Sequence, residues 1–167
     1  MTSIGTAAIL GAVISLGNGS FLDGDRDGES AIRLSAGFTA GPSTGLTAFE
    51  LDHFLTDYLA IAPLLQVGVS DDEFIFAPSV GPKVVFDVRG ARRLLPFVQG
   101  GVGFAYVDDE DDGDDTAFLV MGGGGVEYFV TDRLSLGTAA FFNVLPGEVH
   151  DDEFFFSWHL ITFTVWF

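Results

Sequence analysis

The chain has no cysteine, few basic residues and no long apolar run, and each shortage excludes a class of protein. Without cysteine it can form no disulfide, thiol nucleophile or thiolate metal site. Seven Lys and Arg residues against 24 Asp and Glu residues give a net charge of -17, which leaves no continuous surface able to neutralise the phosphates of a nucleic acid. Because no run of about 20 apolar residues is present, no transmembrane helix is predicted.

The composition that remains is typical of a β-protein. Hydrophobic residues make up 48% of the chain, which contains 18 Phe and 22 Gly. An acidic disordered chain would lack so many aromatic side chains, whereas Gly and aromatic residues together suit tight turns and closely approaching strands. The 167 residues suffice for one domain with a sizeable core, so residues 1–167 are taken as a single domain. No basic segment precedes the apolar residues 3–17, so they are not predicted to be a signal peptide.

The last stretch of the chain, residues 153–167, has the clearest strand pattern. Its two faces are Ile161, Phe163, Val165 and Phe167 against Leu160, Thr162, Thr164 and Trp166. A period of two predicts a strand rather than a helix. One face is wholly apolar, so either a soluble core or the lipid around a transmembrane barrel could cover it.

The same alternation predicts the other strands. They span residues 4–16, 31–55, 58–69, 73–88, 94–107, 116–130 and 134–145. The stretch 31–55 is either one bulged strand or two strands joined at 41–44. Counted once, it gives eight strands with 4–16 as the first, which we favour because bacterial transmembrane barrels have an even number of strands. A second even solution leaves residues 1–16 outside the barrel as an appendage and keeps both short strands.

The predicted connections are of two alternating kinds. The short turns 56–57, 89–93 and 131–133 hold Arg89, Arg92, Arg93 and Arg133, four of the seven basic residues. The loops 17–30, 70–73, 108–115 and 146–153 hold 18 of the 24 acidic residues: Asp23, Asp25, Asp27, Glu29, Asp71, Asp72, Glu73, Asp108, Asp109, Glu110, Asp111, Asp112, Asp114, Asp115, Glu148, Asp151, Asp152 and Glu153. In an up-and-down antiparallel barrel every second connection lies at the same end. The pattern therefore predicts short periplasmic turns and acidic extracellular loops.

The two faces of the predicted strands differ in the same sense along the chain. Val98, Val102 and Phe104 alternate with Gln99 and Gly103. Bulky apolar residues on one face and small or polar residues on the other are what lipid outside and a narrow lumen inside require. A soluble ligand-binding barrel, such as a lipocalin-like carrier, would place the bulky residues inside.

Several phrases of the sequence resemble the eight-stranded bacterial outer-membrane β-barrels, the class of OmpA-like and OmpX-like transmembrane domains. They are FELDHFLTDYLAI, VEYFVTDRLSL, LLPFVQGGVGFAY and the terminal FTVWF. The resemblance spans roughly residues 31–167, and more loosely 4–16. It implies an all-β, antiparallel up-and-down transmembrane barrel in the bacterial outer membrane. It also implies that Phe163, Val165 and Phe167 form an assembly signal read by the barrel-insertion machinery.

Some charged residues are predicted to face the lumen. They are Glu50, Asp52, Asp87 and Glu127, with Lys83 and also Arg33. An eight-stranded barrel is just wide enough for its side chains to fill it. We therefore expect a network of ion pairs that plugs the lumen and satisfies each buried charge. A narrow or gated pore is the alternative.

Two acidic segments suggest cation binding. Asp23, Asp25 and Asp27 form a DxDxDG motif like that of calcium loops, but Leu34 stands where an EF-hand needs its bidentate Glu. It is thus at best a partial calcium site, and the alternative is a solvated acidic loop. The run 108–115 has seven carboxylates in eight residues, which we interpret as an adaptation for solubility in high salt.

One serine and one histidine raise the question of catalysis. Ser157 and His159 lie two apart on the last strand, and an outer-membrane lipid hydrolase, such as a lipid A deacylase, could use a lipid-facing pair with an acid such as Glu153. No distinct motif surrounds them, so no catalytic residue is assigned. Aromatic residues such as Trp158 and Tyr128 suit interface girdles or core packing.

The sequence thus predicts a small monomeric outer-membrane barrel with a structural, adhesive or surface-interaction role and no enzymatic activity. Its expected partners are the lipid bilayer, lipopolysaccharide and the insertion machinery, with no nucleic acid and no cofactor except the calcium considered above. A lipid-modifying enzyme and a narrow channel are the alternative functions.

Overall fold

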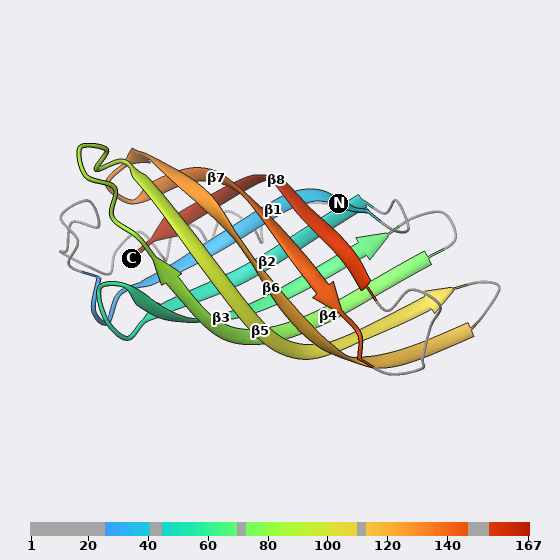
Figure 1. The fold of residues 1–167 in the computed structure, drawn as a ribbon. Helices are drawn as coiled ribbons and strands as arrows, with labels where there is room; N and C mark the ends of the chain where they lie inside the picture. The colour runs from blue at the N-terminus through green and yellow to red at the C-terminus, as the bar shows by residue number, and fades with distance from the viewer. Residues whose placement is uncertain (1–25, 41–44, 70–72, 110–112, 147–153) are drawn as a thin grey trace, which may run out of the picture.

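A computed structural model describes residues 26–40, 45–69, 73–109, 113–146 and 154–167. They form eight strands: β1 (Ser30–Ala40), β2 (Gly45–Phe54), β3 (Leu59–Val69), β4 (Glu73–Val85), β5 (Leu94–Asp109), β6 (Gly113–Thr131), β7 (Leu134–Val144) and β8 (Phe154–Trp166). Each strand pairs antiparallel with the next, and β8 pairs with β1 to close the barrel (Figure 1). No helix among the described residues is long and apolar enough to cross a membrane. The predicted all-β, eight-stranded antiparallel barrel is confirmed.

The identity of the first strands differs from the solution favoured on sequence. The stretch 31–55 is not one bulged strand, because β1 and β2 pair from Ser30 with His53 to Phe38 with Gly45. The chain therefore reverses between Ala40 and Gly45, where Gly, Pro, Ser and Thr are typical turn residues. The barrel closes without residues 4–16, which lie outside the described residues. The second even solution is the one that the described strands follow.

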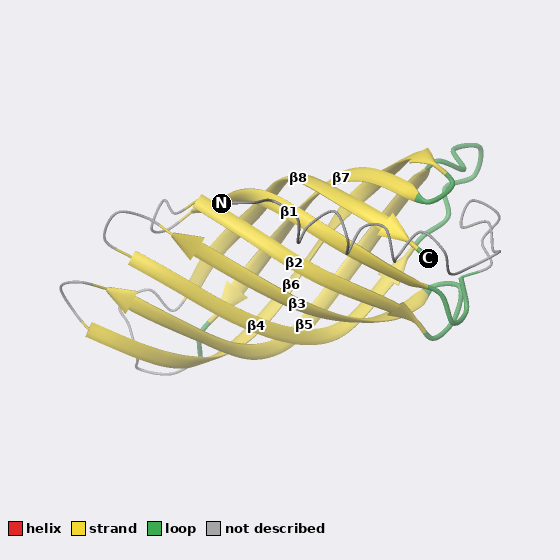
Figure 2. Cartoon of the chain, turned by 180° about the vertical axis from the view of Figure 1, so that it is seen from behind, coloured by secondary structure: helices red, strands yellow, loops and turns green. Residues whose placement is uncertain are grey.

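The two ends of the barrel carry different connections. The turns 55–58, 86–93 and 132–133, together with residues 26–29 and Phe167, lie at one end, which we call the turn end (Figure 2). The opposite end, the loop end, joins the longest strands, β5 and β6. The prediction that loop 17–30 lies with the acidic loops is wrong for its described residues 26–30, because the strand count shifts by one and places them beside the arginine turns.

The alternation of side chains divides the barrel into a lipid-type exterior and a filled interior. Bulky apolar residues point outward along every strand, for example Phe49, Val102, Phe104 and Phe142. The interior holds buried polar side chains between two apolar clusters. In β8 the alternation slips by one at Leu160 and Ile161, both exposed, because a bulge inserts one extra residue against β1 and β7. The spacing predicted that Leu160 would share the face of Thr162. This prediction is wrong, because Leu160 points outward and Thr162 points inward.

Glycines allow β6 to approach its neighbouring strands closely. A Cβ atom at Gly123 would overlap the carbonyl oxygen of Ala140 on β7, so this position of the ladder requires glycine. At Gly125 a Cβ would lie 2.8 Å from Cζ of Phe97, whose ring occupies the lumen. The run of four Gly residues in β6 thus admits a large aromatic side chain from β5 into a narrow interior.

Candidate functional site

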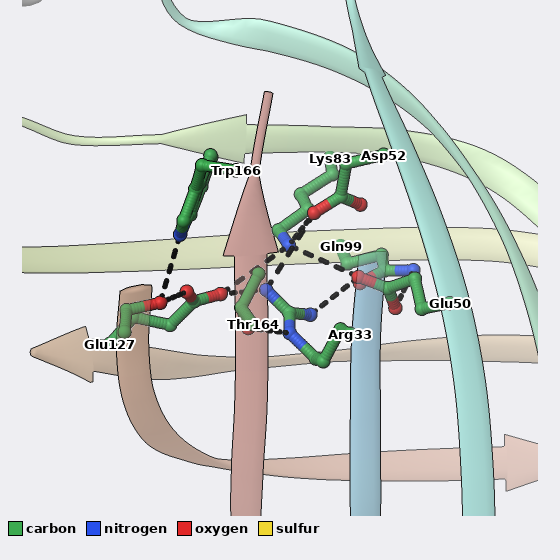
Figure 3. Close-up of polar contacts among 9 residues, drawn as sticks. Arg33, Glu50, Asp52, Lys83, Gln99, Glu127, Thr164 and Trp166 are labelled. Atoms are coloured by element: carbon green, nitrogen blue, oxygen red, sulfur yellow. Dashed lines mark hydrogen bonds and ion pairs between the residues drawn. The ribbon is translucent and has the colours of Figure 1, made fainter. Parts of the chain in front are cut away.

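Five charged side chains from four strands meet inside the barrel and form what we call the lumen cluster. They are Arg33 from β1, Glu50 and Asp52 from β2, Lys83 from β4 and Glu127 from β6 (Figure 3). Each is at most 2% exposed. The strands place them inside because each alternates with outward apolar residues. The structure thus brings together Glu50, Asp52, Lys83 and Glu127, with Arg33, as the sequence pattern placed them.

Arg33 links carboxylates on two sides of the lumen. Its Nη1 donates to Glu50 Oε1 and its Nη2 to Glu127 Oε1, while Asp52 Oδ2 lies 3.7 Å from Nη2. Its Nε donates to the hydroxyl of Thr164, at 3.4 Å. A guanidinium suits this position because its several donors can serve carboxylates from different strands at once.

Lys83, on β4, contacts the same carboxylates as Arg33. Its Nζ lies 2.6 Å from Asp52 Oδ2, 3.1 Å from Glu50 Oε1 and 3.8 Å from Glu127 Oε1. The Gln99 amide donates to Glu50 Oε2 at 3.0 Å. These contacts join β1, β2, β4, β5 and β6 across the lumen.

Neutral side chains complete the cluster. The hydroxyl of Ser135 donates to Glu127 Oε2, and the indole nitrogen of Trp166 donates to Ser135 Oγ at 2.9 Å. The ring of Phe97 lies under both cations, with Arg33 Cζ 4.6 Å and Lys83 Nζ 4.4 Å from its centroid. Stacking of a cation over an aromatic face is favourable in a desolvated site.

An aromatic floor closes the lumen towards the turn end. Trp166 packs against Phe54 and Phe129, with ring centroids 5.8 and 5.2 Å apart. All three side chains are at most 1% exposed. Above the lumen cluster the interior continues with buried residues such as Gln66, Met121 and Phe141. The described interior is therefore packed along its length by side chains from all eight strands.

Asp87 is not a member of the lumen cluster. β4 ends at Val85, so the alternation that pointed Asp87 inward no longer applies beyond the ladder. At the turn end its carboxylate lies 2.7 Å from Arg26 Nη2. Arg26 also donates from Nη1 to the backbone oxygen of Asp57 and from its backbone nitrogen to Asp57 Oδ1. We call these contacts the turn-end latch, since they tie the start of the described chain to two turns.

The proposed calcium motif falls largely outside the described residues. Asp23 and Asp25 are not among them, and Asp27 is an exposed residue at the turn end. Within the described residues no group of three or more His, Cys, Asp or Glu side chains is arranged to hold a metal ion. The partial calcium site therefore stays a sequence-based prediction.

Ser157 and His159 do not face lipid. Both are buried in the lumen, where Asn143 donates to Ser157 Oγ at 3.0 Å and the His159 ring packs 5.1 Å from Phe141. The lipid-facing arrangement expected for a hydrolase is thus absent at this pair. A serine and a histidine do meet on the outer surface at the turn end, where Ser30 Oγ lies 3.0 Å from His53 Nδ1.

The residues of the assembly pattern lie on the outer face of β8 and directly after its last residue. Phe163 is exposed, and Val165 and Phe167 are partly exposed. The backbone of Phe167 exchanges two hydrogen bonds with Ser30, each of 2.8 Å, so this residue lies at the seam between β8 and β1. That position fits a residue needed when the barrel closes, but the signal itself stays a prediction.

Sequence reasoning missed three residues that organise the interior and the latch. Phe97 shares a face with Gln99, and Trp166 shares one with Thr164, so the alternation points both inward, but their aromatic bulk is typical of the lipid face and hid their place in the lumen. Arg26 was counted as part of an acidic loop. A basic residue inside the DxDxDG motif was the one signal that it has a structural partner.

Comparison of the fold with solved structures places it among eight-stranded outer-membrane barrels. The N-terminal β-barrel domain of Pseudomonas aeruginosa OprF matches with a TM-score of 0.67 and 14% identity, over 84% of this chain and 98% of that one. Neisserial surface protein A matches with 0.66 and 12%, over 83% and 96%. The outer membrane enzyme PagL matches with 0.53 and 16%, over 81% and 98%. Neither a protein-family model nor a curated protein matches the chain.

The class of the protein follows from the fold and the surface together. This chain folds as an eight-stranded barrel of the outer-membrane type, as the sequence predicted. The neighbours are outer-membrane proteins, and the belt of exposed apolar residues gives this barrel the surface that lipid covers. Both observations support the predicted outer-membrane location. One fold serves a surface protein and an enzyme alike, so the role is argued from the site and the surface.

Proposed function

We propose that this chain is a monomeric, non-enzymatic outer-membrane barrel that does not conduct and that acts through its acidic loop end, exposed to the cell exterior. The observation that carries the proposal is the contrast between an interior filled by side chains and a loop end whose charged residues are all acidic. The connections at the loop end, together with the adjoining ends of β4, β5 and β6, hold 14 carboxylates: Asp71, Asp72, Glu73, Asp108, Asp109, Glu110, Asp111, Asp112, Asp114, Asp115, Glu148, Asp151, Asp152 and Glu153. None of the seven Lys and Arg residues lies there.

Such a rim suits a surface-interaction or structural role. It attracts divalent cations and positively charged partners and repels like-charged surfaces, with an effect that weakens as salt rises. The bilayer, lipopolysaccharide and the insertion machinery would be its other partners, with no nucleic acid. The buried ion pairs would keep the lumen shut, since an open water-filled pore would solvate them.

The first test asks whether the barrel is a membrane protein with this orientation. It should fold to a β-rich, heat-modifiable species only with micelles or lipid. Because the chain has no cysteine, a single introduced thiol is a unique label. On intact cells an impermeant thiol reagent should label Asp111→Cys, at the loop end, but not the control Arg92→Cys, at the turn end. Equal labelling, or labelling of Arg92→Cys alone, would contradict the orientation.

The second test addresses conduction and adhesion. In planar bilayers the parent should show no conductance steps, and regular steps would refute the closed lumen. Replacing the seven acids of residues 108–115 with Asn and Gln should abolish salt-dependent binding of cells to a positively charged surface while leaving the heat-modifiable fold intact. Unchanged binding would refute the role of the acidic loops.

The lipid-modifying enzyme is the second candidate, favoured only by the exposed contact between Ser30 and His53. No described carboxylate bonds this imidazole, so the contact lacks the orienting acid of a catalytic triad. Incubation with lipid substrates and a serine-reactive probe decides the matter. We expect no lipid release and no labelling of the parent. Release that is lost in Ser30→Ala but kept in Ser157→Ala would establish the enzyme.

A further inference from the structure

The lumen cluster contains one carboxylate more than it has cations. Glu50, Asp52 and Glu127 face Arg33 and Lys83, and all five side chains are at most 2% exposed. The other basic residues of the chain, Arg26, Arg89, Arg92, Arg93 and Arg133, belong to the turn end. No Lys or Arg therefore remains to balance the third carboxylate. A buried charge without a partner is costly enough that such a group is normally neutralised.

The hydrogen bonds single out Asp52 as the carboxylate in excess. Both oxygens of Glu50 accept, from Arg33 and Lys83 at Oε1 and from Gln99 at Oε2. Both oxygens of Glu127 accept as well. Asp52 Oδ2 accepts from Lys83, but Asp52 Oδ1 is buried and has no hydrogen-bond partner.

A second oxygen of this part of the lumen also lacks a donor. Gln99 is the register partner of Lys83, and its side-chain oxygen is likewise buried without a hydrogen-bond partner. A carboxylic acid carries one O–H donor, whereas a carboxylate carries none. A neutral Asp52 would thus add a donor to a cluster in which one oxygen of Asp52 and the side-chain oxygen of Gln99 lack one.

The groups that face Asp52 leave few other ways to balance the charge. Arg33 comes from β1, Glu50 from β2, Lys83 from β4 and Glu127 from β6, and the described inward side chains of β3, β5 and β7 carry no charge. β8 contributes His159, the remaining titratable group of the described lumen. Its Nε2 has no hydrogen-bond partner, and it forms no ion pair with the described carboxylates.

We propose that Asp52 is a buried proton-binding site and that the folded barrel keeps this carboxyl protonated at neutral pH. The cluster is then neutral, with Arg33 and Lys83 balanced by Glu50 and Glu127. Loss of the proton at higher pH leaves an unpaired buried carboxylate between β2 and β4. The closed lumen is therefore more stable at low pH than at high pH, which makes it responsive to the pH around the cell. The inference stands or falls independently of the role of the acidic loops.

The sign of the pH dependence follows from linkage. The unfolded chain releases the Asp52 proton near the ordinary value of an aspartate, about 3.9, whereas the folded barrel keeps it to higher pH. Between these two values the folded state binds one proton more, so stability falls as pH rises. The folding equilibrium constant of the parent should fall by up to about tenfold per pH unit across that window.

The experiment compares the parent with Asp52→Asn in micelles. Asn keeps the shape, is neutral and offers an N–H donor, so the variant should fold and lose the decline in stability that the parent shows between about pH 4 and pH 7. The control Asp87→Asn, an acid of the turn-end latch, should keep the decline. Infrared difference spectra at neutral pH should show the C=O band of a protonated carboxyl in the parent and in Asp87→Asn but not in Asp52→Asn.

Three results would overturn the proposal. A parent without a protonated-carboxyl band has no proton on Asp52, whatever its stability. Loss of the pH-dependent decline in His159→Gln, with the decline kept in Asp52→Asn, would move the proton to the imidazole. A stability that rises with sodium or potassium at constant ionic strength, and no longer does so in Asp52→Asn, would make the bound cation a metal ion rather than a proton.

Discussion

Two arginines seven positions apart in the sequence stand in opposite settings. Arg33, in the lumen cluster, is 2% exposed, and the side chains of its partners Glu50 and Glu127 are also at most 2% exposed. Arg26, in the turn-end latch, is as deeply buried at 3%, but its partner Asp87 is 49% exposed. The comparison teaches that the burial of both partners, rather than of the arginine alone, decides what an ion pair contributes. Water can replace a lost contact at the latch and cannot do so in the lumen.

The largest effect is expected for Arg33→Met. The substitution keeps much of the side-chain volume but leaves Glu50 and Glu127 with fewer partners in a site that water does not reach. Breaking a buried ion pair in this way costs about 3–5 kcal/mol. Denaturant unfolding in micelles measures it, with Leu34→Met, on the lipid face of the same strand, as the control. The double variant Arg33→Met, Glu127→Gln should recover part of the loss, and no recovery would show that packing rather than charge was lost.

A smaller effect is expected for Arg26→Gln. It removes the ion pair with Asp87 and the bond to the Asp57 backbone, while the backbone bond from residue 26 to Asp57 Oδ1 can persist. A hydrogen bond to a charged group contributes about 1.5–3 kcal/mol. Because the Asp87 carboxylate is half-exposed and water can replace Arg26 there, we expect the variant to lose about 2 kcal/mol of unfolding free energy in total. A loss as large as that of Arg33→Met, measured in the same way, would contradict the distinction between the two sites.

How far the sequence predicts this contrast depends on where the strands end. Inside a ladder the period of two is reliable, so Glu50, Asp52, Lys83 and Glu127 were placed inside from their bulky neighbours. Asp87 has the same pattern but lies past the end of β4, and no local signal marks that end. The position of Arg26 depends on a count of strands, which residues 41–44 left open. Long-range pairing rather than local propensity decides such cases.

The bulge in β8 shows a second reason why sequence reasoning ends where it does. Leu160 and Ile161 are both apolar, so the pattern reads equally well with or without an extra residue. The register with β1 and β7 decides that both point outward and that His159 and Thr162 point inward. The catalytic interpretation of Ser157 and His159 depended on that register, which no single strand encodes.

The ring beneath the two cations tests the lumen side of the comparison without changing a charge. Phe97→Leu removes the aromatic face under Arg33 and Lys83 and leaves space beside Gly125. A cation–π contact in a desolvated site is worth up to about 2 kcal/mol, and we expect a loss of about 1–2 kcal/mol. Phe104→Leu, on the lipid-facing side of the same strand, is the matched control and should change the unfolding midpoint little. Equal losses of stability in the two variants would show that the cations have no part in the effect.

The smallest effect, and the sharpest test of the comparison, is expected for Asp87→Asn. The side-chain oxygen of Asn can still accept from Arg26, and the half-exposed position lets water solvate the guanidinium, so the loss should be about 0.5–1 kcal/mol. Because the pair is reached by solvent, salt should screen it, and the difference between parent and variant should shrink as salt rises. The loss in Arg33→Met should not change with salt, since ions do not enter the lumen. A salt-independent loss in Asp87→Asn would mean that the latch is as dry as the lumen, and that the exposure of the carboxylate is not what separates the two arginines.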